Sequence, residues 1–309
     1  MSTHIRHVDG ALGTLSQRLG PYAAIARPQF LVLPLTLVVL GATASAVDGT
    51  FDLLRSFLAL FGLLAAHVAV NALNEASDAA RGIDDRTDPT PFSGGTKTIT
   101  EGELSVSQAR RFGLAAGAVA TVVGLWFVWV VGVAIVPLVV AGAVFVVGYT
   151  DVFARVALGE LVAGLGLGGL PVLGVALVQS GAVGPVAIAV AIPASLLTAC
   201  LLLLNEFPDE EPDRIGGRRN IVLVFGRRRG AWAYVLLALG VPTTIAALAL
   251  TGEIPLPTLF GVVPSLLLAR PLSWALNCPE KSVPVPALRR NVSWVLATNV
   301  AMAVGLLVA

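Results

Sequence analysis

The chain contains few cysteines, few histidines and few charged residues for its length. Two cysteines among 309 residues imply no disulfide framework. Histidines are also few, with three in the chain. Charged residues make up only 13% of the chain, whereas hydrophobic residues make up 56%, and the mean hydropathy is +0.85. An ordinary soluble domain carries about twice that charged fraction. The composition therefore predicts a membrane protein without a separate soluble module.

Long apolar runs fill most of the sequence. A helix that crosses a bilayer needs about 20 mostly apolar residues, and about nine candidate runs are present. They lie at 30–47, 57–73, 112–131, 134–149, 158–178, 185–204, 231–251, 255–269 and 292–309. We expect an all-α, polytopic fold in one membrane domain over 1–309, with a polar N-terminal segment at 1–20.

Basic residues are distributed unevenly between the expected loops. All 20 lysines and arginines except Arg55 lie in the N-terminal segment or in loops that follow even-numbered helices. Basic residues accumulate on the cytoplasmic side of a membrane. We therefore expect the N-terminus and these loops in the cytoplasm and the C-terminus outside.

Acidic residues form two clusters in these same loops, at 71–88 and 205–214. Three positions of the first cluster align with three of the second at one constant offset: Asn74, Glu75 and Asp78 with Asn205, Glu206 and Asp209. This alignment predicts two pseudo-repeats of about four helices, and repeats often share a site at their interface. The four-residue spacing of Asn205, Asp209 and Asp213 predicts that they share one helical face.

The two clusters offer oxygen ligands and lack the His or Cys spacing of zinc and iron sites. Carboxylate and amide oxygens suit Mg²⁺, whose octahedron is usually completed by water and substrate phosphates. Basic residues beside each cluster can bind the remaining phosphate oxygens: Arg81, Arg86 and Lys97 near the first, and Arg214, Arg218 and Arg219 near the second. The pattern predicts a Mg²⁺-bridged diphosphate site where apolar helices reach the cytoplasm.

Other polar residues have simpler interpretations. Charges at helix ends are often solvated caps, although two copies in register favour a site. His67, two turns inside the membrane on the Asn74 face, is interpreted as a hydrogen-bonded packing residue. Tyr149, in G-Y-T-D, is either an interface anchor or a site residue. Asp151 and Glu160 are the candidates if a phenolic acceptor needs a general base.

These motifs resemble those of the UbiA superfamily of intramembrane prenyltransferases. The resemblance extends from A-R-P-Q-F at 26–30 to the C-terminal helix. N-E-A-S-D-A-A-R-G-I-D at 74–84 is similar to the N-D-x-x-D-x-x-x-G-x-D motif, and A-L-G-E-L at 157–161 to a G-L-G-E-L-type sequence. N-E-F-P-D-E-E-P-D at 205–213 with G-G-R-R-N at 216–220 resembles the second motif. The G-x-D ending and T-P-F-S-G-G at 90–95 are most similar to the 1,4-dihydroxy-2-naphthoate prenyltransferases of menaquinone synthesis.

The resemblance implies nine helices around a central cavity that holds Mg²⁺ and an isoprenyl diphosphate. It assigns metal binding to Asn74, Asp78, Asp84, Asn205, Asp209 and Asp213. It assigns diphosphate contacts to Asn74, Arg86, Lys97, Asn205, Arg218 and Arg219. Asp78, Asp209 and Asp151 are the expected catalytic residues. Glu75 replaces the more usual aspartate and is one methylene longer, so the resemblance does not decide whether its carboxylate contacts a metal.

The expected function is Mg²⁺-dependent transfer of an isoprenyl group from a polyprenyl diphosphate to an aromatic or lipid-soluble acceptor such as 1,4-dihydroxy-2-naphthoate. Apolar walls of the first, second, fourth and fifth helices would hold the isoprenoid tail. The expected surroundings are membrane lipids, and no nucleic-acid partner is expected.

Three alternatives differ in what they require. A terpene cyclase of the same superfamily would use the same aspartates. A divalent-cation transporter would need acids along a path across the bilayer, whereas the extracytoplasmic half holds only Asp48, Asp52 and Glu253. A CDP-alcohol phosphotransferase would need a D-G-x-x-A-R-type motif, which this sequence lacks.

Overall fold

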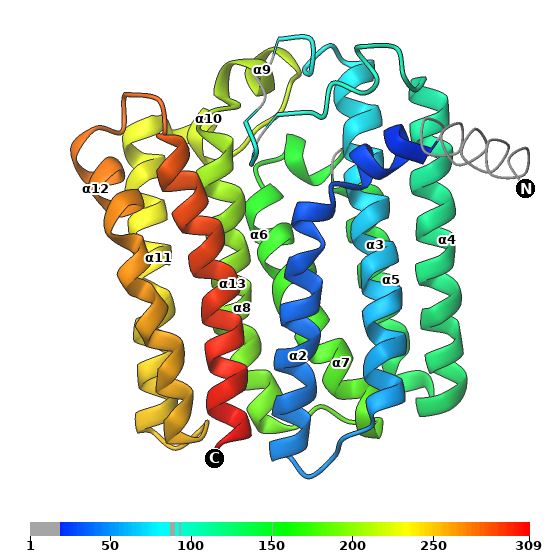
Figure 1. The fold of residues 1–309 in the computed structure, drawn as a ribbon, viewed down its shortest axis with the longest axis vertical. Helices are drawn as coiled ribbons and strands as arrows, with labels where there is room; N and C mark the ends of the chain where they lie inside the picture. The colour runs from blue at the N-terminus through cyan, green and yellow to red at the C-terminus, as the bar shows by residue number, and fades with distance from the viewer. Residues whose placement is uncertain (1–18, 87–89, 93, 150) are drawn as a thin grey trace, which may run out of the picture.

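The structure is a computed structural model that describes residues 19–86, 90–92, 94–149 and 151–309. Most of the polar N-terminal segment, and Ser93 of the S-G-G sequence, lie outside these ranges. The described residues form helices and turns without a strand, which confirms the all-α expectation (Figure 1). The longer helices are α2 (Val32–Val47), α3 (Leu53–Ala80), α4 (Val106–Val131), α5 (Val136–Gly148), α7 (Leu170–Ser180), α8 (Pro185–Glu206), α11 (Arg227–Leu250), η5 (Leu256–Leu268), α12 (Ala269–Asn277) and α13 (Val285–Leu307). The shorter ones are η1 (Pro28–Phe30), η2 (Val133–Ile135), η3 (Phe153–Arg155), α6 (Gly159–Gly164), η4 (Leu165–Gly169), α9 (Glu210–Ile215) and α10 (Ile221–Phe225).

Several of these helices are long and apolar enough to cross a membrane. In the described part of the chain there are six such spans: α3, α4, α6 to α7, α8, α11, and η5 to α12. A seventh is possible if Leu19–Phe30 and α2, which meet at a bend of 47°, count as one span. Val133–Gly148, which includes α5, is apolar but shorter. The expected number of nine membrane helices is therefore not confirmed and stays a prediction.

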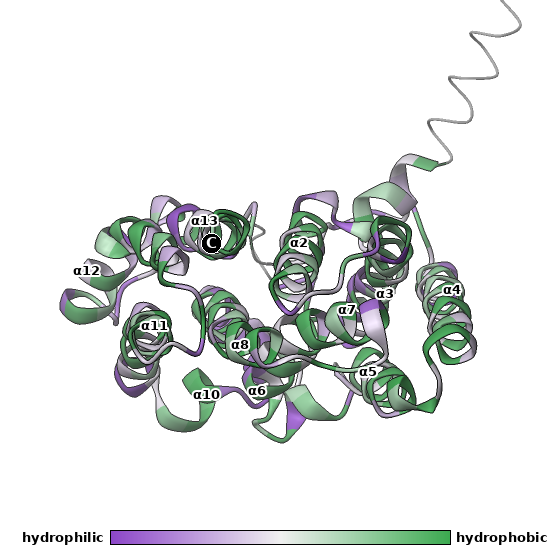
Figure 2. Ribbon diagram, turned by 90° about the horizontal axis from the view of Figure 1, so that it is seen from below, coloured by the Kyte–Doolittle hydropathy of each residue, from purple (hydrophilic) through white to green (hydrophobic). Residues whose placement is uncertain are grey.

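Large apolar side chains cover the outside of the bundle as well as its interior. Seen from below, most of the helices are coloured as hydrophobic over much of their length (Figure 2). Trp129 and Leu266 are 82% and 80% exposed, an exposure that suits contact with lipid better than contact with water. Inside, the main core joins residues of α2, α8, α11 and α13, with Trp294 and Tyr234 fully buried.

Local sequence signals set the helix ends that matter for the site. α3 begins after Asp52, whose side chain accepts a hydrogen bond from the Arg55 backbone N–H. α4 begins with a capping box between Ser105 and Gln108. α8 ends at Glu206 because Pro208, two residues later, has no backbone N–H to continue the helical ladder.

The two acidic clusters lie at the same end of the bundle. In Figure 1 the segments that follow α3 and α8 both lie at the upper end, together with α9 and α10. The connections from α2 to α3 and from α7 to α8 lie at the lower end, with the C-terminus. This arrangement places the ends of α3 and α8 so that their polar residues meet.

Candidate active site

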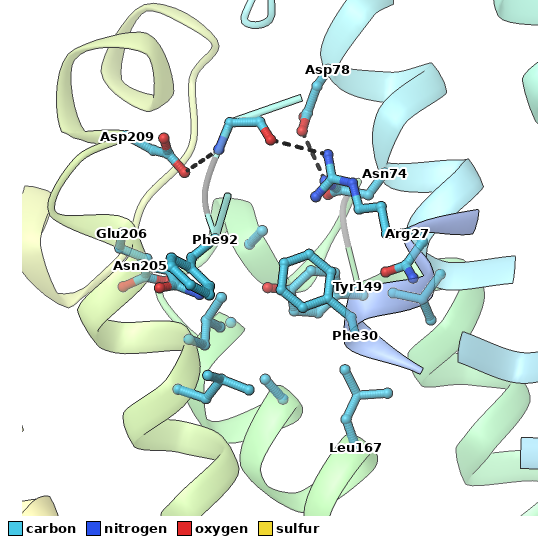
Figure 3. Close-up of a pocket in the computed structure, with 18 of the residues that line it drawn as sticks. Arg27, Phe30, Asn74, Asp78, Phe92, Tyr149, Leu167, Asn205, Glu206 and Asp209 are labelled. Atoms are coloured by element: carbon cyan, nitrogen blue, oxygen red, sulfur yellow. Dashed lines mark hydrogen bonds between the residues drawn. The ribbon is translucent and has the colours of Figure 1, made fainter. Parts of the chain in front are cut away.

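A cavity of about 210 Å³ lies where the two acidic clusters meet. Figure 3 shows Asn74 and Asp78 of α3 facing Asn205 and Glu206 of α8 across this space. Tyr149, at the end of α5, also lines it. Apolar residues form its deeper wall: Phe30, Leu33, Leu167, Leu201, Val295 and Leu296. The cavity therefore has a polar end and an apolar end.

The first half of the site comes from α3 and the turn after it. The Asn74 amide donates to one Asp78 carboxylate oxygen at 2.9 Å. Both residues lie in the last two turns of α3, and four-residue spacing brings their side chains together on one face. Asp84 follows in the turn, is 2% exposed and also lines the cavity.

The second half is built differently from the prediction. Asn205, Asp209 and Asp213 do not share one helical face, because α8 ends at Glu206 and α9 begins at Glu210. Asp209 lies in the turn between the two helices, and Asp213 belongs to α9. All three still line the cavity, because the turn directs the chain back over it. The prediction of a shared helical face was wrong, and the break in the helix after Glu206 is the reason.

Arg218 joins the two halves. Its guanidinium donates hydrogen bonds to two residues of α3: to Asn74 Oδ1 at 2.9 Å and to Asp78 Oδ1. It also pairs with Asp213 of α9 at 3.2 Å. Burial alone would lower the pKa of Arg218, but the neighbouring carboxylates outweigh burial and raise it. The arginine is therefore a fixed cation between the two acidic clusters.

The loop that contains T-P-F-S-G-G connects the same two halves. Its Gly94 N–H donates to Asp209 at 3.3 Å (Figure 3). Gly94 has a φ of 78°, which favours glycine. At Gly95 a Cβ would lie 2.4 Å from Asp84 Oδ1, so only glycine leaves room for that carboxylate. The two glycines therefore let the loop close over the acidic residues.

Glu75 holds this loop and does not line the cavity. It is 1% exposed and accepts hydrogen bonds from the Thr96 backbone N–H at 2.7 Å and from the Thr96 hydroxyl at 2.5 Å. Its other oxygen pairs with Arg27 at 2.7 Å. The longer side chain of glutamate therefore connects α3 to the loop and to the segment before α2, which answers the question of where this carboxylate reaches.

Acidic side chains outnumber basic ones in the cavity lining. Five acids line it (Asp78, Asp84, Glu206, Asp209 and Asp213) against three arginines (Arg27, Arg218 and Arg219). Burial raises the pKa of Asp84 to about 7, and the carboxylates of Asp78 and Glu75 add to the shift. Burial is the main cause that raises the pKa of Asp209 to about 7, and the nearby Asp213 carboxylate adds to the shift. Carboxyl groups in such surroundings favour a bound cation, which would restore their ionised form.

Three buried oxygen atoms of the second half have no hydrogen-bond partner among the described residues. They are Asn205 Oδ1, Glu206 Oε2 and Asp209 Oδ1. In the part of the chain that the structure describes, no three His, Cys, Asp or Glu side chains are grouped closely enough to hold a metal alone. Mg²⁺ commonly takes only one or two carboxylates and completes its shell with water and substrate phosphates. The unpaired oxygens therefore fit a Mg²⁺ ion that is shared with a phosphorylated substrate.

Three predicted site residues lie away from the cavity lining. Arg86 is exposed and donates to the Gly82 carbonyl. Lys97 donates to the Asp84 carbonyl. Asp151 accepts from Ser77 at 2.8 Å and from Arg81 at 2.7 Å. Burial would raise the pKa of Asp151, but these hydrogen bonds outweigh burial and lower it. Functional roles for these three residues stay predictions.

Two charged cavity residues were not assigned to the site from the sequence. Arg27 lines the cavity and pairs with Glu75. An isolated arginine directly before Pro28 at the start of an apolar run was the available signal. Glu206 is 8% exposed and lines the cavity beside Asn205. It was visible in the sequence only through its alignment with Glu75, and the two side chains take different roles.

A second, apolar chamber of about 630 Å³ lies deeper between α3, α4, α5 and α7. Among the residues that the structure describes, its lining contains no charged residue, and its polar side chains are His67 and Thr121. His67 and Leu167 also line the first cavity, so the two spaces adjoin at these residues. α2 borders the first cavity through Leu33, whereas α4 supplies a wall of the chamber.

Comparisons with known proteins agree on one family. Residues 33–299 match the UbiA prenyltransferase family. The chain is 27% identical over 297 residues to 1,4-dihydroxy-2-naphthoate octaprenyltransferase of Escherichia coli, covering 91% of this chain and 92% of that protein. The same name belongs to a relative from Bacillus subtilis, 25% identical over 213 residues, which span 66% of this chain and 65% of that protein.

The fold is also similar to a solved structure of a UbiA homolog from Archaeoglobus fulgidus bound to DMAPP and Mg²⁺. The TM-score is 0.60 at 17% identity, over 92% of this chain and 99% of that one. The likeness at this identity concerns the fold, and it agrees with the membrane helices found here. This chain is therefore an integral membrane protein that belongs to the UbiA prenyltransferase family, a class of enzymes that transfer prenyl groups.

Proposed function

We propose that this protein transfers an isoprenyl group from a polyprenyl diphosphate to an aromatic acceptor, with Mg²⁺ as cofactor. The observation that carries the proposal is the meeting of two acidic clusters, from α3 and from the α8–α9 turn, at the polar end of one cavity. An apolar interior continues from that end. A head group that carries negative charge and a long apolar tail suit these two environments. The relatives named for 1,4-dihydroxy-2-naphthoate make that molecule, a quinone precursor, the preferred acceptor.

Different residues of the cavity would bind the metal and the diphosphate. Asn74, Asp78 and Asp84 on one side, and Asn205, Asp209 and Asp213 on the other, would hold Mg²⁺ and, through it, the diphosphate. Bound Mg²⁺ would supply positive charge that stabilises the departing diphosphate. Arg218 and Arg219 line the same cavity and would contact the remaining phosphate oxygens. The Mg²⁺-bound homolog of known structure supports this choice of metal.

The apolar walls have a chemical task of their own. Cleavage of an allylic diphosphate develops positive charge on carbon, and water would convert that carbon to an alcohol. The deeper wall of the cavity consists of side chains such as Leu33, Leu167 and Leu201, which exclude water from the reacting carbon. The same walls would hold the isoprenoid tail.

The test is a product analysis on the purified protein in detergent or nanodiscs. We expect geranylgeranyl diphosphate, Mg²⁺ and 1,4-dihydroxy-2-naphthoate to give a prenylated naphthoquinol, identified by mass spectrometry. A parallel reaction without acceptor should give no cyclic hydrocarbon. A cyclic product from that second reaction would support the cyclase alternative and contradict transfer. Failure with this acceptor but success with another phenol would correct the acceptor only.

We also propose that the polar end of the cavity faces the cytoplasm, because basic residues accumulate there. In a background without Cys200 and Cys278, single substitutions Glu101→Cys and Glu211→Cys should react with an impermeant thiol reagent only from the cytoplasmic side. Glu253→Cys, in the connection at the opposite end, should react only from outside. Labelling of the first two from opposite faces would contradict a single site formed by both loops.

A further inference from the structure

His67 lies on α3 where the polar cavity and the apolar chamber adjoin. It is 6% exposed and lines both spaces, as does Leu167. It precedes Asn74 by two helical turns, so it lies about 10 Å deeper along the helix axis. The imidazole is therefore placed beyond the acidic residues, at the depth where an acceptor ring below the diphosphate would reach.

The two ring nitrogens of His67 have different environments. Nδ1 lies 3.0 Å from the Leu63 carbonyl oxygen. A carbonyl can only accept a hydrogen bond, so Nδ1 carries the hydrogen, and in the neutral ring Nε2 is left as an acceptor. Nε2 is buried and has no partner among the described residues. His67 Nε2 is therefore an unpaired hydrogen-bond acceptor at the junction of the two spaces.

Among the described residues that line both spaces, His67 is the one whose side chain keeps an unpaired buried polar atom. A buried acceptor without a partner weakens a fold, whereas an apolar residue of similar shape would avoid that cost. Thr121, the other polar side chain of the chamber, already donates its hydroxyl to the Gly117 carbonyl of its own helix. Within the described lining of the chamber, His67 is thus the single titratable group. Its free nitrogen is available for a ligand.

We infer that His67 Nε2 binds the hydroxyl group of the aromatic acceptor and takes its proton during prenyl transfer. This inference rests on the proposed function. It assigns to His67 the general base that was sought at Asp151 or Glu160. Asp151 is held by Ser77 and Arg81, and Glu160 accepts from the Ile221 backbone N–H. Both of these carboxylates therefore already have partners.

The step balances as follows for a phenolic acceptor. The O–H proton moves to Nε2, and its bonding pair stays on oxygen, which makes the ring more nucleophilic. A ring carbon forms a bond to C1 of the prenyl group while the C1–O bond breaks and its pair leaves with the diphosphate. The attacked carbon then loses its former substituent and keeps the bonding pair: either a proton leaves to the departing diphosphate or, from a carboxylated acceptor, carbon dioxide leaves. Aromaticity returns, and oxygen regains its proton from His67.

The experiment compares two substitutions in the full-length protein. His67→Phe removes both nitrogens, and His67→Gln keeps an acceptor that cannot take up a proton. We expect kcat for transfer to fall about a hundredfold in both, in the lower range for loss of a general base. The acceptor KM should stay within threefold of wild type in His67→Gln and rise in His67→Phe. Binding of Mg²⁺–prenyl diphosphate, measured by calorimetry, should change less than threefold in both variants.

Thr258→Val is the matched control, because Thr258 also has a buried oxygen without a partner in the described chain but lies outside both cavities. Its kcat should stay within threefold of wild type. Transfer by His67→Phe at a rate within threefold of wild type would overturn the inference. So would a loss of diphosphate binding that matches the loss of transfer, because His67 would then act on the fold or the donor. A wild-type protein that prenylates no phenol would instead refute the proposed function itself.

Discussion

Asp78→Ala and Asp209→Ala should each lower the turnover of prenyl transfer by at least about a hundredfold, which corresponds to about 3 kcal/mol in the barrier. Asp78 contacts Asn74 and Arg218, and Asp209 keeps a buried oxygen without a partner, so each belongs to a different half of the site. Each half is proposed to hold metal charge against the leaving diphosphate. We expect that neither half compensates for the loss of the other. Steady-state kinetics with saturating donor measure the effect.

The double substitution should be little worse than either single one, because residues that act as one unit give non-additive losses. Asp78→Asn serves as a second variant, since it keeps a side chain that can accept from Arg218 while removing the charge. Asp48→Ala is the control, because Asp48 follows α2 at the opposite end of the bundle, and its activity should be close to wild type. Losses of only a few fold at both aspartates, in folded protein, would make them helix-end charges without a catalytic role.

Removal of divalent metal should abolish transfer completely. The cavity lining carries five acids against three arginines, so without a metal cation it would lack the positive charge needed to bind an anionic diphosphate. We expect EDTA to reduce product formation to background and excess Mg²⁺ to restore it. Mn²⁺ should also restore activity, because hard oxygen ligands discriminate poorly between the two ions. Product formation by mass spectrometry is the measurement.

A second readout separates metal binding from damage to the protein. Donor binding should weaken in EDTA and recover with Mg²⁺, while the thermal unfolding temperature without donor should change little, since Arg218 already pairs with two of the acids, Asp78 and Asp213. Undiminished turnover in chelator would show that the carboxylates do not bind a metal–diphosphate complex. The acids would then need another explanation, such as pairing with Arg218 alone.

Much of the architecture follows from local patterns in the sequence. Apolar runs of membrane length can form only helices in a bilayer, because every backbone polar group must be satisfied within the segment. The all-α fold and the approximate positions of the helices follow from that constraint. The repeat of N-E-x-x-D at 74–78 and 205–209 correctly brought Asn74, Asp78, Asn205 and Asp209 together, because both copies end a helix at the same end of the bundle.

The same patterns could not resolve how each side chain is used. Spacing alone placed Asp209 on the helix of Asn205, but Pro208 ends that helix and the turn redirects the carboxylate. Arg86 and Lys97 are near the first cluster in sequence, yet Arg86 points to solvent and Lys97 to a backbone carbonyl. Arg27 lies 48 residues from Glu75 in the chain, and only helix packing brings the two side chains into contact.

The sequence by itself therefore determined that this protein lies in a membrane, that its fold is helical, and that it carries a pair of acidic motifs with the chemistry that such motifs suit. These properties depend on composition and on short-range spacing. The tertiary structure decided which of the charged residues enter the cavity, which hold a loop, and which side chain keeps a free atom for a ligand. Those choices depend on contacts between segments far apart in the chain. His67 illustrates the difference: its spacing indicated packing, but the environment of Nε2 depends on α3, α4, α5 and α7 together.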